Sequence, residues 1–157
     1  MNALDNLCKQ VLQTLRGQTL VTAESLTGGG IGAALTAVSG ASEIYKGGVI
    51  SYTNEVKEAV LGVPSGILAR YGAVSLWTAG YMADGVRDLM KADVAVSVTG
   101  LAGPGGDEFG HEVGTVFIGY SSRHNSVAKE FRFSGDRESV RRQTVEAALR
   151  LILEQNK

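Results

Sequence analysis

The chain has 157 residues, of which 44% are hydrophobic, so it is long enough to form a single domain, over residues 1–157, with a core of its own. Its 15 basic and 16 acidic residues give a net charge of −1, which excludes the broad positive field used to bind nucleic acid and favours a small-molecule partner. Because the single cysteine, Cys8, excludes an internal disulfide framework and no run approaches the roughly 18 apolar residues of a membrane span, we expect a soluble, cytoplasmic protein with no membrane contact.

Hydrophobic spacing predicts alternating helices and strands in the first half of the chain. Apolar side chains recur every three or four residues near the N-terminus, as on one face of a helix, and short apolar runs near glycines indicate strands. The expected elements are a helix over 3–16, a strand over 18–23, a glycine-rich turn over 24–32 leading into a helix that ends near Gly40, a strand over 47–53, and a short helix that Asn54 caps and that runs through Val60. The first strand therefore delivers Ser25 to a strand-to-helix corner.

The second half is expected to contain a long helix, a buried strand and a hairpin. The expected elements are a helix that Ser75 caps, with an apolar face from Leu76 to Met90, a strand over 93–99, a glycine-rich loop over 100–114, strands over 115–121 and 126–133, and a final helix over about 136–154. The short connection between the last two strands predicts an antiparallel hairpin. This order predicts an α/β fold with a mixed sheet of about five strands covered by helices on both faces.

The segment AESLTGG at 23–29 holds a candidate nucleophile. A serine at a strand-to-helix corner exposes its hydroxyl near unpaired backbone N–H groups, which are able to stabilise an oxyanion, although Ser25 in such a place is also a common helix cap. A nucleophilic serine needs a base. The two histidines, His111 and His124, leave a Ser-His-Asp arrangement open, but no other feature of the sequence supports it.

Lys57 is the alternative base, since a Ser-Lys pair works when the amine is partly neutral. It falls in the first turn of a predicted helix, where the helix dipole lowers the pKa of a lysine. Moving that pKa from about 10.4 to about 7 requires roughly 4 to 5 kcal/mol, so burial must contribute too. The competing interpretations are a solvated Lys57 on an amphipathic helix and a half-buried Tyr52 in a strand rather than a proton relay.

Two later segments have the composition of anion-binding sites. The strand and loop SVTGLAGPGG at 97–106 would let backbone N–H groups approach a phosphate, although it matches neither a Walker motif nor the dinucleotide fingerprint and is otherwise an ordinary turn. The segment FSGDRESVRR at 133–142 places Arg137, Arg141 and Arg142 at the start of the last helix, where they either grip a phosphate or are simply exposed.

A metal site is a further alternative in the glycine-rich loop. Asp107, Glu108, His111 and Glu112 lie within six residues. There is no second histidine at helical spacing, so a solvated loop is the favoured interpretation.

Seven segments occur in one order along the chain: AESLTGG, GGVISYTNEVK, VLGV, YGAVS, SVTGLAGPGG, VGTVFI and FSGDRESVRR. In this combination, over about residues 5–153, the chain resembles the CinA carboxy-terminal domain family, the nicotinamide-nucleotide amidases. The resemblance implies a three-layer α/β/α sandwich that converts nicotinamide mononucleotide to nicotinate mononucleotide and ammonia in pyridine-nucleotide salvage, a part of NAD metabolism. It implies no metal or other cofactor, and family members of this size often form homo-oligomers.

The resemblance also assigns roles to individual positions. Ser25 falls on the family's nucleophile, and Tyr52 and Lys57 fall on residues that take part in proton transfer. The positions assigned to substrate or oxyanion contacts are Thr27, Gly28, Gly29, Thr99, Gly100 and Ala102. Arg137 matches an arginine that we assign to the substrate phosphate.

The chain departs from the family pattern at two places. Leu26 stands where cysteine is common, and the loop reads DEFGHEVG where a Lys-Pro pair often precedes Val-Gly. Neither departure removes the expected nucleophile or base. They leave open a shifted substrate, or a paralogue that binds nucleotides without useful turnover; a structural or interaction protein, with Ser25 only a cap, is the third alternative.

Overall fold

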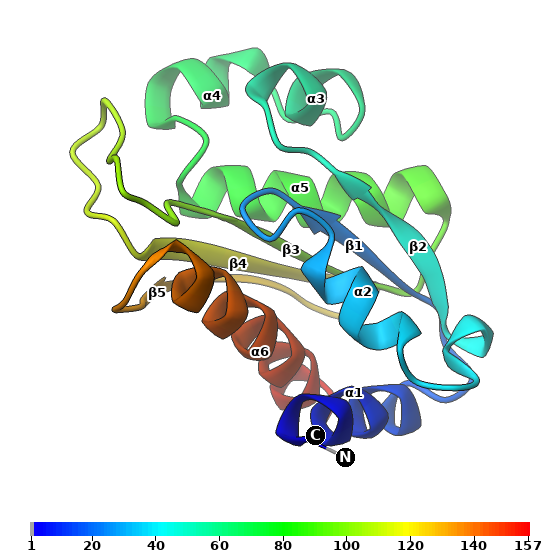
Figure 1. Ribbon diagram of the computed structural model, residues 1–157. Helices are drawn as coiled ribbons and strands as arrows, with labels where there is room; N and C mark the ends of the chain where they lie inside the picture. The colour runs from blue at the N-terminus through cyan, green and yellow to red at the C-terminus, as the bar shows by residue number, and fades with distance from the viewer. Residues whose placement is uncertain (1) are drawn as a thin grey trace.

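The computed structural model describes residues 2–157, and its strands form one mixed sheet in the order β2-β1-β3-β4-β5 (Figure 1). The strands are β1 (Leu20–Glu24), β2 (Tyr45–Ile50), β3 (Val94–Gly100), β4 (Thr115–Ser122) and β5 (Ser126–Arg132). β1 pairs in parallel with β2 and β3, whereas β4 pairs antiparallel with both β3 and β5. The predicted five-stranded mixed sheet and its terminal hairpin are confirmed.

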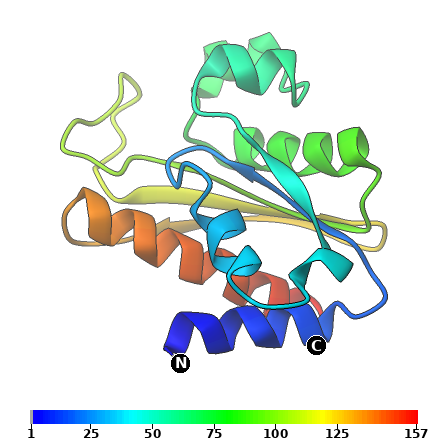
Figure 2. The same cartoon turned by 45° about the vertical axis from the view of Figure 1, so that its right-hand side comes forward.

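Helices cover both faces of this sheet, so the predicted three-layer α/β/α arrangement is confirmed. The helices are α1 (Ala3–Thr14), α2 (Gly30–Thr36), α3 (Asn54–Ala59), α4 (Ser65–Tyr71), α5 (Leu76–Met90) and α6 (Arg137–Gln155), with a short 3-10 turn at Ala41–Glu43. Figures 1 and 2 show α1, α2 and α6 on one side of the sheet and α5 on the other, with α3 and α4 above α5. Among residues 2–157, no helix has the length and apolar character needed to cross a membrane.

β3 lies at the centre of the sheet, and its side chains supply both layers of the core. Val94, Val96 and Val98 pack with the core formed by α1, α2 and α6, whereas Ala95 packs with Met82 of α5. A strand covered on both faces needs apolar side chains at successive positions rather than at alternate ones. The continuous apolar run predicted this central position.

The helix boundaries differ from the expected ones mainly around the third helix. Thr53, not Asn54, caps α3, because the Thr53 side chain accepts a hydrogen bond from the N–H of Val56 at 3.3 Å. Ser75 caps α5 as predicted, accepting from the N–H of Thr78 at 3.0 Å. α4 was not predicted: it is only seven residues long and follows Pro64, so its apolar period is too short to be recognised.

A close contact between α5 and the chain after α3 places α3 above the sheet. Gly85 of α5 touches the backbone of Leu61, and a Cβ at Gly85 would overlap the Leu61 carbonyl oxygen. The same connection turns back on α3, since the N–H of Val63 donates to the carbonyl of Lys57 at 3.1 Å. The position of Lys57 therefore depends on the absence of a side chain at Gly85.

Two alanine substitutions in α5 test this contact. We expect Gly85→Ala to lower the free energy of unfolding by about 2 kcal/mol or more, because the Leu61 backbone has to move. Gly80→Ala, in the same helix but with open space around the added Cβ, should raise it by about 0.5 to 1 kcal/mol. Denaturant unfolding of both variants measures the difference, and equal effects would contradict the close approach of α5.

Candidate active site

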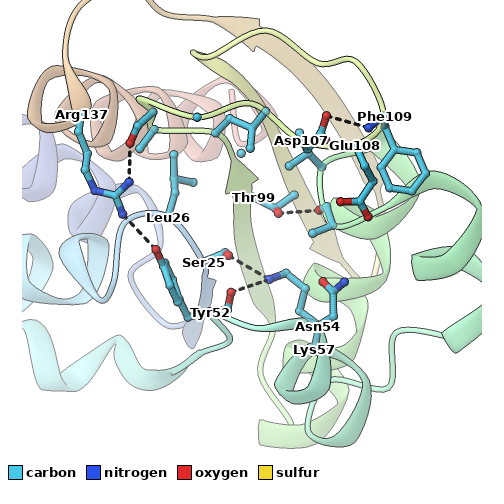
Figure 3. A pocket seen from close by; sticks show the side chains of 17 residues that line it. Ser25, Leu26, Tyr52, Asn54, Lys57, Thr99, Asp107, Glu108, Phe109 and Arg137 are labelled. Atoms are coloured by element: carbon cyan, nitrogen blue, oxygen red, sulfur yellow. Dashed lines mark hydrogen bonds between the residues drawn. The ribbon is translucent and has the colours of Figure 1, made fainter.

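A pocket of about 410 Å³ lies where the carboxyl ends of β1, β2 and β3 meet (Figure 3). Ligands of α/β proteins commonly bind at this edge of a parallel sheet. Seven of the ten predicted site residues line the pocket: Ser25, Tyr52, Lys57, Thr99, Gly100, Ala102 and Arg137. The other three, Thr27, Gly28 and Gly29, lie in the turn behind Ser25 and are not part of its wall.

Ser25 and Lys57 are in hydrogen-bond contact at the floor of the pocket. The Nζ atom of Lys57 lies 3.0 Å from the Oγ atom of Ser25, and it donates to the carbonyl of Ser51 at 2.7 Å and that of Tyr52 at 3.4 Å. Both side chains are buried, with Lys57 only 1% exposed. Figure 3 shows the Lys57 side chain extending toward Ser25, with a dashed line marking the contact between the amine and the hydroxyl.

Three partners suit this amine in both of its protonation states. A neutral amine has two hydrogens and one lone pair, which match the two carbonyls and the Ser25 hydroxyl as donor. A protonated amine has three hydrogens, for which the same two carbonyls and the Ser25 oxygen are acceptors. Lys57 is therefore able to take or return a proton at Ser25 without changing its contacts.

Burial lowers the pKa of Lys57 from its ordinary 10.5 to about 8. The physical cause is the loss of water around the charged amine, which favours the neutral form. The expected contribution of the helix dipole is wrong: α3 has six residues and Lys57 lies in its last turn, not its first. Burial alone makes Lys57 a base near neutral pH.

The turn after Ser25 is fixed by glycine and by a buried carboxylate. Gly28 and Gly29 have φ angles of 58° and 102°, a left-handed backbone that side chains disfavour. Glu24 is 2% exposed, and its carboxylate accepts from the Thr27 hydroxyl at 2.6 Å and from the N–H groups of Ile31 and Gly32 at 2.8 and 3.0 Å. The carboxylate thereby caps the N-terminus of α2, where a negative charge is favourable.

The turn after Ser25 contains backbone N–H groups that are free to act as donors. The N–H of Gly28 is used by the carbonyl of Ser25 at 3.1 Å, so it is not available to a ligand. Within the described part of the chain, the N–H groups of Leu26, Thr27 and Gly29 have no acceptor. Leu26 follows Ser25 directly and lines the pocket, so the first of these donors lies next to the serine.

Arg137 and Tyr52 meet at one end of the pocket (Figure 3). Arg137 donates through Nη1 to the carbonyl of Gly103 at 2.7 Å and through Nη2 to the hydroxyl of Tyr52 at 3.0 Å. The Tyr52 hydroxyl thus faces Arg137, and only the Tyr52 backbone contacts Lys57. A role for Tyr52 in proton transfer stays a prediction.

The histidines do not serve Ser25. His111 bonds to Asp107 through Nδ1 at 2.7 Å, and the Asp107 carboxylate also accepts from the N–H groups of Phe109 and His111. His124 lies in the turn between β4 and β5, at the end of the sheet away from the pocket. No group of three or more His, Cys, Asp or Glu side chains in residues 2–157 is arranged to hold a metal.

Sequence reasoning missed several residues of the site. Asn54, Asp107, Glu108 and Phe109 line the pocket, although the sequence suggested Asn54 only as a helix cap and Asp107 and Glu108 only as metal ligands. Thr99, a predicted site residue, donates its hydroxyl hydrogen to the carbonyl of Ala73 at 2.7 Å. Glu24 was also missed, although an acidic residue between a strand and a glycine-rich helix start is a usable signal for a cap. The loop residues carried no signal for this pocket, because loop conformation depends on distant contacts.

Comparison with known proteins identifies relatives of this chain. Residues 2–156 match the family model of the CinA C-terminal domain. A putative competence-damage inducible protein of Desulforamulus reducens is 47% identical over 86% of this chain, and the chain spans about a third of the length of such curated relatives. A CinA superfamily protein of Klebsiella pneumoniae has a similar solved structure, with a TM-score of 0.95, 36% identity, and coverage of 99% of this chain and 98% of that one.

A second solved structure agrees equally well. The competence/damage inducible protein CihA of Agrobacterium tumefaciens has a TM-score of 0.95 and 37% identity, covering 100% of this chain and 98% of its own. Both solved structures match this chain over nearly their whole length. The fold described above is therefore shared across the full domain.

The buried amine makes the stability of the protein depend on pH. Between about pH 8 and 10.5, the folded state has released the Lys57 proton while the unfolded state still holds it. The free energy of unfolding should therefore rise with pH in this window, by about 1.4 kcal/mol per pH unit from this group, and show no slope from it below pH 8. Lys57→Met should lose this rise, which denaturant unfolding across the window measures.

The matched control is Lys91→Met, which removes an exposed lysine. It should keep the pH dependence of the wild type. A Lys57→Met variant with the same dependence as the wild type would show that Lys57 keeps its ordinary pKa.

Proposed function

The chain belongs to the CinA C-terminal domain family, and on that basis we propose that it is a nicotinamide-nucleotide amidase. The proposed reaction hydrolyses nicotinamide mononucleotide to nicotinate mononucleotide and ammonia, a step of pyridine-nucleotide salvage. The observation that carries the proposal is the buried contact of 3.0 Å between the Lys57 amine and the Ser25 hydroxyl. A buried lysine that meets a serine in a pocket has the parts of a Ser-Lys nucleophile.

In the first proposed step, Ser25 forms an ester with the substrate. Neutral Lys57 takes the hydroxyl proton as the Ser25 Oγ attacks the carboxamide carbon, which creates a tetrahedral oxyanion. The N–H groups of Leu26 and Thr27 stabilise that oxyanion, an effect worth about 3 to 4 kcal/mol for one donor. Lys57 then returns its proton to the leaving nitrogen, the C–N bond breaks, and ammonia departs.

In the second step, water releases the product. Lys57, neutral again, takes a proton from a water molecule as its oxygen attacks the ester carbon. Collapse of this second oxyanion breaks the bond to Ser25, whose oxygen receives the proton from Lys57, and nicotinate mononucleotide leaves. The chemistry uses one amine twice, and with a pKa of about 8 roughly one molecule in ten carries it neutral at pH 7.

Arg137 is the proposed contact for the substrate phosphate. It lines the pocket at the end opposite Asp107 and Glu108 (Figure 3). Its bonds to Gly103 and Tyr52 use two of the five guanidinium donors and leave three. Guanidinium groups bind phosphate through such paired donors. Tyr52, which accepts a hydrogen bond from Arg137, helps to orient this guanidinium. This role is proposed in addition to the predicted role of Tyr52 in proton transfer.

The remaining contacts and the setting of the protein are proposed on the same basis. Thr99, Gly100 and Ala102 form the wall against which the substrate lies, with no metal or cofactor in the reaction. Thr27, Gly28 and Gly29 contribute by fixing the backbone conformation of the turn that follows Ser25. We further propose that the protein works in the cytoplasm as a homo-oligomer.

Replacing the nucleophile tests the proposed reaction. Ser25→Ala should lower the rate of ammonia release from nicotinamide mononucleotide by about 10³-fold or more, while calorimetry still detects substrate binding. Ser42→Ala, at an exposed position away from the pocket, is the control and should match the wild type. Equal rates for Ser25→Ala and wild type would exclude this nucleophile. Tight binding without any product in the wild type would instead indicate a nucleotide-binding module.

The role of Arg137 is tested with two substrates. Arg137→Met should raise the KM for nicotinamide mononucleotide by about 10- to 100-fold, because a charge-assisted contact to phosphate is lost. It should leave the KM for nicotinamide riboside, which has no phosphate, nearly unchanged. Arg142→Met, an exposed neighbour in α6, is the control. An equal loss with both substrates would contradict a phosphate contact.

A further inference from the structure

Arg141 holds the turn that follows the nucleophile, although it lies outside the pocket wall. It donates through Nε to the carbonyl of Leu26 at 2.9 Å and through Nη2 to the carbonyl of Thr27 at 3.3 Å. A Cβ at Gly28 would also lie 3.4 Å from this guanidinium, which shows how closely it rests on the turn. Through Arg141, α6 is therefore hydrogen-bonded to the backbone that follows Ser25.

The geometry points to Arg141 as a positioning residue for the oxyanion donor at Thr27. This inference rests on the proposed amidase function, in which that N–H stabilises the tetrahedral intermediate. Arg141 does not touch the substrate in this account. It acts through the peptide unit that joins Leu26 to Thr27.

Because the peptide unit is planar, the bond from Arg141 to the Leu26 carbonyl also fixes the direction of the Thr27 N–H. The C=O and N–H of a trans peptide point in opposite directions, and rotation about the C–N bond is strongly hindered. Because the Leu26 carbonyl points toward Arg141, the Thr27 N–H points away from it. The Leu26 N–H is set in the same way, since the carbonyl of its peptide, that of Ser25, accepts from Gly28.

Glu24 holds Thr27 from the opposite side. Its buried carboxylate accepts from the Thr27 hydroxyl at 2.6 Å, while the Thr27 carbonyl is held by Arg141 and by the N–H of Gly30 at 3.0 Å. Thr27 is thus fixed by contacts to its hydroxyl, to its own carbonyl and to the carbonyl of Leu26. The donors of an oxyanion site contribute most when they are oriented before the reaction starts.

The charge of Arg141 also strengthens the donor that it orients. A cation bonded to a peptide oxygen draws electron density from the amide and makes its N–H a better donor. Two of the Arg141 donors are spent on the turn, and Arg137 rather than Arg141 lines the pocket. These contacts favour a positioning role over phosphate binding.

Steady-state kinetics with nicotinamide mononucleotide test the inference. Arg141→Met should lower kcat by about 10- to 100-fold with KM within about twofold, because the lost contact acts on the oxyanion and not on the bound substrate. Arg141→Lys, which keeps the charge but not the forked donors, should fall between Arg141→Met and wild type. Arg142→Met is the matched control and should behave as wild type. A raised KM with unchanged kcat, or Arg141→Met kinetics equal to those of Arg142→Met, would overturn the inference.

A second measurement, NMR of the Thr27 amide, tests the conformation of the turn without requiring catalytic activity. In ¹⁵N-labelled protein, the Thr27 amide proton should move upfield in Arg141→Met, but not in Arg142→Met. If the wild type hydrolyses no amide, the proposed function fails while this measurement still decides the placement of the turn. An unmoved Thr27 amide in Arg141→Met would overturn the inference whatever the activity.

Discussion

Burial of the Lys57 amine is the constraint on which the site depends. A charged amine loses its hydration when it is enclosed, so the protein must supply polar partners and favour the neutral form. The carbonyls of Ser51 and Tyr52 and the hydroxyl of Ser25 supply those partners, and the pKa falls to about 8. The same burial that costs folding free energy therefore makes an ordinary lysine into a base. An exposed lysine in the same position would be charged and inert toward Ser25.

The sheet brings these groups together from distant parts of the chain. β1 ends at Glu24, next to Ser25, and β2 runs parallel beside it and ends just before Ser51 and Tyr52. Because parallel strands end at the same edge, Ser25 lies close to the carbonyls of Ser51 and Tyr52, although 26 and 27 positions separate them in the sequence. α3 follows β2 and carries Lys57, whose amine lies at this edge of the sheet. The fit of α5 against the chain after α3 keeps that helix in place.

The sequence predicted the parts of this site that follow from local pattern. Hydrophobic runs indicated the strands, and the AESLTGG segment indicated the corner that presents Ser25. Contacts between distant residues were not predictable, and they decide the rest. Arg137 and Arg141 are one helical turn apart and share a face of α6, yet Arg137 lines the pocket and Arg141 bonds to the turn after Ser25. Only the packing of α6 against the turn separates these two roles.

The two departures from the family pattern act on different parts of the site. In the proposed reaction Leu26 acts only through its backbone, and its side chain, 4% exposed, packs in the core with α2 and α6. A leucine in place of the common cysteine therefore leaves the N–H and carbonyl groups of the turn where they are. The altered loop is different, because Asp107, Glu108 and Phe109 stand in the pocket wall while Lys57 and Ser25 lie on its floor. In the proposed reaction, the loop thus bears on which amide fits the pocket, whereas the Ser25–Lys57 contact does not involve it.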